Sequence, residues 1–241
     1  MKKILCIVLV LLSISFCSCS GSGTNNNQKP IENTIKNNGG KGEATVSSEE
    51  YGVDEEDIKI TPYAYYSSTN NGYLALVFYN TSTKTCGLDV NVTFFDYKNK
   101  KLDDSHDSIR AFPAGSSTVL IFNCFKGKFK KYKYEIETQD NSKSYVPITQ
   151  NLQTTVKLNK EKISLNSDKT TAVVNVKNNG KAIDDTIKVH FLFFKGNKLV
   201  DTNNRYIYDS INPKKSAKVE AISYENCDSV KVYLDGYGYK K

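Results

Sequence analysis

The sequence contains no tryptophan, and its single methionine is the first residue. Only two of its 241 residues are histidines, so any catalysis would have to rely on carboxylates or a cysteine. It has no P-loop, nucleophile elbow or H-E-x-x-H motif, and no C-x-x-C pair follows the N-terminal segment. The composition excludes a polytopic membrane protein, a coiled coil and a wholly disordered chain. We therefore expect no enzyme, no metal site and no cofactor.

The N-terminus has the pattern of a secretory signal peptide. Lys2 and Lys3 are followed by an almost unbroken apolar run from Ile4 to Phe16. As a helix this run would span only about 20 Å, too short for a bilayer. We expect residues 1–18 to be a leader that is removed from the mature chain.

The segment Phe16-Cys17-Ser18-Cys19-Ser20-Gly21 resembles a bacterial lipoprotein lipobox, although Phe16 stands where leucine is usual. The resemblance implies that the sulfur of Cys19 carries the lipid, with palmitate-type acyl chains. Two or three chains would anchor firmly, because each buried CH₂ contributes ~0.8 kcal/mol. Cys17 stays an alternative, as does a plain secreted protein. The expected location is the extracytoplasmic face of the cell membrane.

Residues 19–54 are rich in glycine, serine and asparagine and show almost no apolar periodicity. Such a segment cannot bury enough apolar area to offset the entropy of ordering it. We expect a disordered tether that holds the rest of the chain away from the membrane.

The remainder of the chain reads as two copies of one unit. Val92-Thr93-Phe94-Phe95 recurs as Phe191-Leu192-Phe193-Phe194, and Pro113 aligns with Pro213, at an offset of 99 to 100 residues. Phe78-Tyr79-Asn80 matches Val176-Lys177-Asn178. This repetition predicts tandem domains over residues 55–149 and 155–241.

Alternation of apolar and polar residues predicts antiparallel β-strands in both copies. The apolar positions keep the same parity in the two copies, and a slip of one residue would turn every side chain to the opposite face. In the first copy they are Leu74, Leu76 and Phe78; Leu88, Val90, Val92 and Phe94; and Val119 and Ile121. In the second they are Ala172, Val174 and Val176; Ile187, Val189, Phe191 and Phe193; and Val219 and Ala221. The pattern favours an all-β fold of two tandem antiparallel β-sandwiches.

An aromatic strand end followed by a polar turn and a proline-containing turn resembles the FxLYD domain family of bacterial surface lipoproteins. Phe191-Leu192-Phe193-Phe194 stands in for F-x-L-Y, but Lys195 replaces the aspartate; the first copy keeps Asp96 and lacks the first phenylalanine. The resemblance implies Ig-like β-sandwiches and carries no catalytic residues.

Basic residues are unevenly distributed. Residues 54–150 hold 12 basic and 12 acidic side chains, whereas residues 151–241 hold 16 basic and 10 acidic ones. The densest basic stretch is nevertheless in the first copy, where Tyr132, Tyr134 and Ile136 would face the core. Its lysines are a candidate site for an anionic envelope polymer, or else a solvated edge of a sheet. They are Lys126, Lys128, Lys130, Lys131 and Lys133.

Four tyrosines form a second candidate, a recognition patch on the outer face of a strand pair: Tyr63, Tyr65, Tyr73 and Tyr79. Either this face is exposed for a partner, or the other domain covers it. His190, of opposite parity to Phe191, should lie on an outer sheet face. Cys86 and Cys124 could form a disulfide or remain buried thiols, and Cys227 has no obvious partner.

We therefore expect a membrane-anchored cell-surface lipoprotein that acts as a non-enzymatic binding or scaffolding module. Its partner would be an anionic envelope polymer or a surface protein, and not nucleic acid, which the compartment excludes. The alternative is a cell-envelope enzyme or accessory hydrolase that uses the polar stretch Asp103–Asp107, which includes His106.

Overall fold

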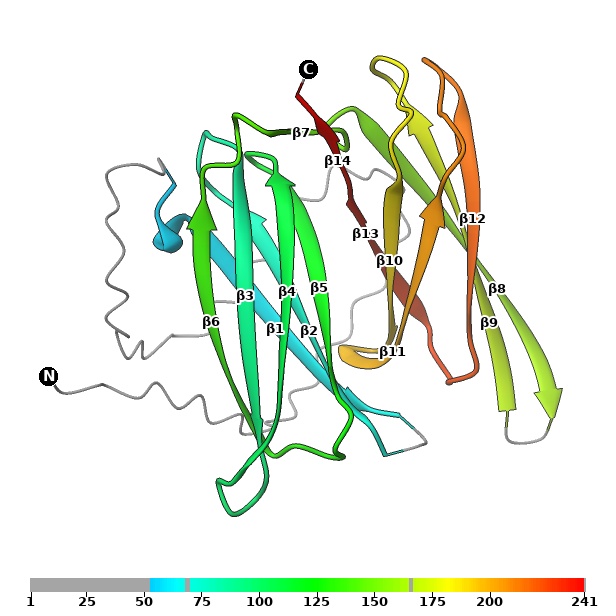
Figure 1. The fold of residues 1–241 in the computed structure, drawn as a ribbon. Helices are drawn as coiled ribbons and strands as arrows, with labels where there is room; N and C mark the ends of the chain where they lie inside the picture. The colour runs from blue at the N-terminus through cyan, green and yellow to red at the C-terminus, as the bar shows by residue number, and fades with distance from the viewer. Residues whose placement is uncertain (1–52, 68–69, 165–166, 241) are drawn as a thin grey trace, which may run out of the picture. The chain divides into compact units, whose positions relative to one another are not determined.

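Antiparallel β-strands build the fold, as the alternating sequence pattern predicts (Figure 1). The computed structural model describes residues 53–67, 70–164 and 167–240, in which the one helical segment is the 3-10 turn η1, Glu55–Asp57. The predicted leader and nearly all of the predicted tether lie outside these residues. The strands are β1 (Ile58–Tyr66), β2 (Gly72–Asn80), β3 (Cys86–Phe95), β4 (Lys101–Phe112), β5 (Ser117–Cys124), β6 (Lys131–Gln139), β7 (Tyr145–Pro147), β8 (Leu152–Ser164), β9 (Ser167–Asn178), β10 (Ile187–Lys195), β11 (Lys198–Ile207), β12 (Ser216–Ser223), β13 (Ser229–Asp235) and β14 (Tyr237–Tyr239).

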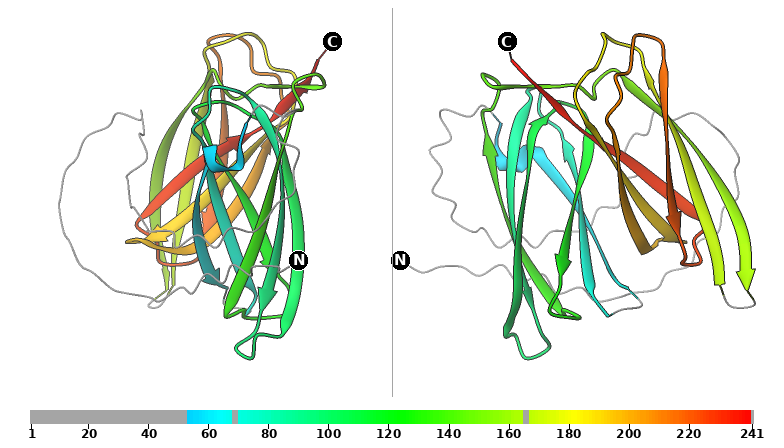
Figure 2. Two further views of the ribbon diagram at one scale, coloured as in Figure 1. Left: turned by 90° about the vertical axis from the view of Figure 1, so that its left-hand side faces the viewer. Right: turned by 45° about the vertical axis from the view of Figure 1, so that its right-hand side comes forward.

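Four three-stranded sheets make up the body of the fold. In the N-terminal half, β1 to β7, the sheets have the orders β1-β2-β5 and β4-β3-β6. In the C-terminal half, β8 to β14, they have the orders β12-β9-β8 and β11-β10-β13. Both halves therefore have one topology, with each strand of the first matched by the strand seven places later. The matched strands β7 and β14 pair with each other, which ties the chain end back to the first half (Figures 1 and 2).

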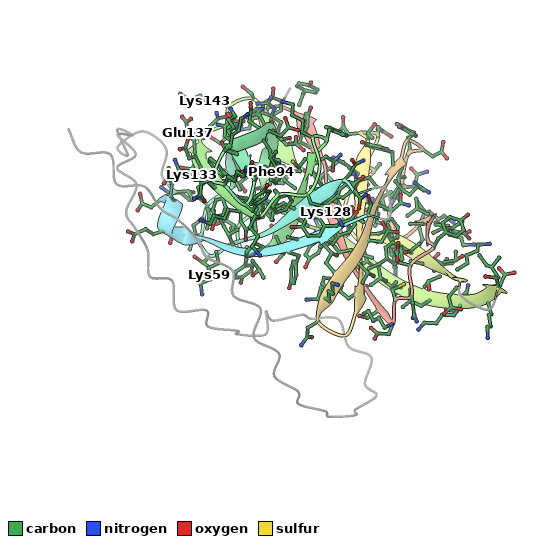
Figure 3. The ribbon with its side chains drawn as sticks, turned by 90° about the horizontal axis from the view of Figure 1, so that it is seen from below. Lys59, Phe94, Lys128, Lys133, Glu137 and Lys143 are labelled. Carbon is green, nitrogen blue, oxygen red and sulfur yellow. The ribbon has the colours of Figure 1, made fainter. Side chains whose placement is uncertain are left out.

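Each half encloses an apolar core between its two sheets. The N-terminal core contains the predicted inward residues of β2 and β3, and Phe94 lies at its centre in Figure 3. The C-terminal core contains the predicted inward residues of β9 and β10. Tyr132 is buried against the first core, and Tyr134 and Ile136 pack on it, so the predicted parity of β6 is also confirmed.

The predicted parity of β5 is wrong by one residue. Leu120 and Phe122 fill the N-terminal core, whereas Val119 and Ile121 lie on the other face of the sheet. Both faces of β5 are buried, so both alternate sets of its residues are apolar. The pattern therefore does not show which set faces the N-terminal core.

A third apolar cluster lies between the two halves. The outer face of sheet β1-β2-β5 packs on the outer face of sheet β11-β10-β13, and Leu192 and Phe194 of β10 form one buried cluster with Ala75 and Val119. Leu192, Ala75 and Val119 are fully buried. All described residues accordingly belong to one compact unit, Ser47–Lys241.

Candidate binding surfaces

The basic stretch spans the turn between β5 and β6 and the first residues of β6. Lys126, Lys128 and Lys130 lie on the turn and are exposed, whereas Lys131 and Lys133 lie on β6 and are half-buried. Figure 3 places Lys128 and Lys133 on different sides of Phe94. The structure therefore does not gather these five lysines on a single surface.

The ammonium groups of four of these lysines contact other side chains. Lys126 Nζ lies 3.3 Å from Asp103 Oδ1, and Lys133 forms an ion pair with Glu135. Lys131 Nζ donates to Asn99 Oδ1 at 2.6 Å, and Lys128 Nζ lies 5.7 Å from the centre of the Tyr66 ring. Two of the five charges are thus neutralised by carboxylates, which weakens this stretch as a site for a polyanion.

The polar stretch on β4 does not form a convergent site. Asp103 accepts from the Phe125 amide and pairs with Lys126; slight burial acts to raise its pKa, but Lys126 holds that pKa below its ordinary value. Asp104 pairs with Lys101 at 2.7 Å, and His106 Nε2 lies 3.7 Å from Asp89 Oδ1. Asp103, Asp104 and His106 therefore each contact a different charged residue and do not converge on one point. Within the described ranges, no three histidine, cysteine or acidic side chains come together as a metal site.

Three of the four candidate recognition tyrosines belong to the cluster between the halves. Tyr65 is buried, stacks on Tyr73 at 4.8 Å, and its hydroxyl lies 2.9 Å from Thr202 Oγ1 of β11. Tyr63 meets the ring of Phe194 edge-on at 5.1 Å. Of the two alternatives for this face, the structure has the covered one, and a partner could reach these three rings only in part. Tyr79 lies half-buried near the end of β2.

All three described cysteines are buried free thiols. Burial raises the pKa of Cys86 to about 12, and it also raises the pKa values of Cys124 and Cys227. These thiols are therefore protonated at neutral pH and unreactive as nucleophiles. Cys17 and Cys19, the candidate lipidation sites, lie outside the described residues.

His190 lies on the outer face of its sheet, as its parity predicts, but the N-terminal half covers that face. Its side chain is 1% exposed, and neither ring nitrogen has a hydrogen-bond partner. Asn204 lies opposite it on β11, and its Oδ1 is also unpartnered. Burial lowers the pKa of His190 to about 3, and the positive charge of Lys188 acts in the same direction. The ring is therefore neutral at physiological pH.

An open polar hollow, which sequence reasoning did not find, lies on the outer face of sheet β12-β9-β8. It has a volume of about 350 Å³ and is lined by Gln153, Thr155, Asn175, Lys177 and Ser216. Cross-strand pairing aligns Gln153, Lys177 and Ser216 in one row, and Thr155 with Asn175 in the next. Alternation predicts that these residues face outward. Their meeting depends on the register of three strands, which the sequence does not reveal.

No family model matches this chain, and neither does any curated protein. Red sea bream transglutaminase is similar at 9% identity over 75% of this chain and 29% of its own length, with a TM-score of 0.26. The tandem CBM22-1–CBM22-2 domain of Paenibacillus barcinonensis Xyn10C is similar at 11% identity over 76% of this chain and 84% of its own, with a TM-score of 0.16. Both scores are too low to carry an argument.

Among the residues that the structure describes, no helix has the length and apolar character needed to cross a membrane.

Proposed function

We propose that this protein is a lipid-anchored lipoprotein of the cell surface whose β-sheet region is a non-enzymatic binding module for an anionic envelope polymer. The anchor is argued from the sequence alone: a basic start, an apolar run from Ile4 to Phe16, and the lipobox-like segment that ends at Cys19. The FxLYD resemblance of the two halves agrees with this placement.

The observation that carries the binding role is unneutralised positive charge on the C-terminal half. Its residues 151–241 hold 16 basic and 10 acidic side chains, and within the described part of this half only two lysines, Lys169 and Lys218, pair with a carboxylate. The N-terminal half is neutral by count. A surface that keeps its positive charge raises the local concentration of anionic partners and speeds their association.

An envelope hydrolase built on Asp103–Asp107 is not supported by the geometry. Hydrolysis by paired carboxylates needs two such groups facing one bound bond from distinct environments. Asp103 and Asp104 instead pair with different lysines, and His106 is largely exposed. A surface protein as partner is an outcome that the following experiment distinguishes.

The test is binding of the purified mature chain to soluble poly(glycerol phosphate), with dextran as a neutral polymer of similar length. We expect binding to the anionic polymer at low salt that weakens as salt screens the charges, and no binding to dextran. Absence of binding to the anionic polymer at low salt, or equal binding to both polymers, would overturn the proposal and leave a protein partner or a simple spacer.

A further inference from the structure

We infer that the polar hollow on sheet β12-β9-β8 is the ligand site, and that it takes a phosphate-bearing polyol chain. This inference rests on the proposed function above and assigns it to particular residues. In Figures 1 and 2 this sheet lies on the side of the C-terminal half away from β10, β11 and β13, and no described strand covers its outer face.

The hollow arises from the sizes of the outward side chains. The neighbouring residues of opposite parity, Val174 and Val176, are fully buried in the C-terminal core, which fixes the direction of the hollow's residues. Short side chains at Thr155 and Ser216 lie on the two strands that flank β9. Adjacent strands are about 4.8 Å apart, so the hollow extends roughly 10 Å across three strands, enough for an extended polymer segment.

Lysines concentrate at the end of the sheet where the hollow lies. Lys177 lines it, and the turn before β12 brings Lys214 and Lys215 beside the end of β9. That turn is held by two backbone hydrogen bonds to Asn178: its amide donates to the Lys215 carbonyl at 2.9 Å, and its carbonyl accepts from the Lys214 amide at 2.8 Å. Lys177, Lys214 and Lys215 are all exposed.

None of these three lysines forms an ion pair with a described residue, whereas Lys218 on the adjoining strand pairs with Glu220 at 2.6 Å. Three positive charges at one edge of a polar hollow, without carboxylates to neutralise them, complement a chain that carries repeated negative charge.

Lys214 adds a conformational observation. Its φ is 65°, in the left-handed region, and the equivalent residue of the N-terminal half is Gly115, with a φ of 64°. A lysine in this conformation carries a backbone cost that glycine avoids. The C-terminal half thus has a strained cationic residue at its turn, and such strain clusters at functional sites.

The chemistry of the lining residues selects the ligand class. Lysine ammonium groups act as point charges and bind phosphate oxygens. The amides of Gln153 and Asn175 and the hydroxyl of Ser216 can donate to and accept from the hydroxyls of a polyol. A polymer of alternating phosphate and polyol offers both partners.

The first test compares two variants, each of which loses three positive charges, one at the hollow and the other in the basic stretch. We compare Lys177→Gln/Lys214→Gln/Lys215→Gln with Lys128→Gln/Lys130→Gln/Lys131→Gln in binding to poly(glycerol phosphate). Because the net charge falls equally, loss of long-range attraction alone would affect both variants alike. We expect the first to bind about tenfold more weakly or worse, and the second to stay within roughly threefold of the original chain.

The second test changes shape without changing charge. Asn175→Leu should fill part of the hollow and weaken binding about tenfold while leaving the salt dependence unchanged. Thr171→Leu is the matched control, because Thr171 has the same outward parity on β9 and lies outside the hollow. Circular dichroism and thermal unfolding confirm that each variant is folded before its binding is compared.

The outcomes separate this inference from the function on which it rests. Equal losses in the two triple variants, or a loss confined to the Lys128 variant, would overturn the hollow as the site while leaving polymer binding intact. Binding to phosphatidylglycerol vesicles without binding to the soluble polymer would identify a lipid headgroup and overturn both. No binding by the original chain would also overturn both.

Discussion

Asn80 and Asn178 make the same five hydrogen bonds at equivalent corners of the two halves. Each side-chain amide donates to two carbonyls, and each Oδ1 accepts from a backbone amide two residues later. Their backbone groups bind the turn before the fifth strand of the half. The donated bonds are Asn80 Nδ2 to the Lys84 and Phe112 carbonyls, at 2.9 and 3.2 Å, and Asn178 Nδ2 to the Lys181 and Ile211 carbonyls, at 2.6 and 2.7 Å.

Replacing either asparagine by alanine should be strongly destabilising. The change removes three side-chain hydrogen bonds at each corner, one of them a buried bond to the Phe112 or Ile211 carbonyl, and each lost bond costs about 0.5–1.5 kcal/mol. We expect Asn80→Ala and Asn178→Ala each to lower the free energy of unfolding by about 2–3 kcal/mol in urea titrations. Asn179→Ala, at an exposed neighbouring position, is the control and should change it by less than about 0.5 kcal/mol. Losses no larger than the control's would show that these corners are not important for stability.

Leu192 should couple the unfolding of the two halves. Its fully buried side chain lies in the cluster between them, and truncating such a leucine costs about 2–5 kcal/mol. We expect the original chain to unfold in one calorimetric transition and Leu192→Ala to show two. Ile163→Ala, which shortens an exposed apolar side chain, should retain the single transition. One transition in both variants would mean that the other contacts between the halves suffice.

Acidification should destabilise the contact around His190. The pKa of this ring is about 3 in the folded chain and about 6.5 when unfolded, so below pH 6.5 the unfolded state binds the extra proton. Stability is therefore fully present above pH 6.5 and falls as the pH drops toward 3. Between pH 7 and 5 we expect the original chain to lose about 2 kcal/mol more than His190→Leu in urea titrations. Equal losses would show that protonation of His190 does not limit stability.

The comparison with His190→Leu isolates the ring from other titrating groups. The charged and titratable groups around it include Lys188 on β10, Tyr233 and Asp235 on β13, and the tyrosines of β1 and β2 across the interface. Burial raises the pKa of Asp235; Lys188 acts against this shift and Asp107 adds to it. Because its pKa is raised in the folded chain, the Asp235 carboxyl stabilises the fold as the pH falls, which is opposite to the effect of His190. Asp235 is present in both proteins, so its contribution cancels in the difference.

Substitutions at Gly115 and at Lys214 should change the free energy of unfolding in opposite directions. Both have a φ near 65°, and an added Cβ at Gly115 would meet no atom within 4 Å, so backbone conformation alone sets the cost. We expect Gly115→Ala to lower, and Lys214→Gly to raise, the free energy of unfolding by about 1 kcal/mol. Thermal unfolding measures both. A change of the same sign at the two sites would contradict the equivalence of the two turns.

Cys19 should be the lipidated residue. Cells grown with labelled palmitate should yield a mature protein whose N-terminal peptide carries the label, as measured by mass spectrometry. Cys19→Ala should lose the label and leave the membrane fraction, whereas Cys17→Ala should keep both. An unmodified N-terminus in the original chain would contradict the anchor, and loss of label only in Cys17→Ala would move it to the alternative cysteine.

Much of the fold could be predicted because alternation is a local property. Leu74, Leu76 and Phe78 share a face in any extended strand, and the repeated parity in the second half made that assignment firm. The alignment of Pro113 with Pro213 shows a limit of matching the two halves by sequence alone. In the structure Ser116 donates to Pro113 as Lys215 donates to Asn212, so the two prolines lie one residue apart in equivalent turns.

The candidate sites were harder to predict because they depend on contacts between distant segments. Tyr65 lies 137 residues from Thr202, and nothing in either neighbourhood reveals their hydrogen bond. The hollow likewise needs Gln153, Lys177 and Ser216 to align across three strands. The basic stretch was conspicuous in the sequence for the opposite reason: its lysines are close along the chain, although the fold separates Lys128 from Lys133.

The sequence by itself determined the strands, the inward face of most of them and the duplication of one topology, because the two-residue period of a strand is set by local backbone geometry. The tertiary structure alone decided which outer faces are covered. Val119 and His190 are buried, and among the described residues Lys177 stays exposed, because burial depends on which surface packs against which. That packing joins residues more than a hundred positions apart.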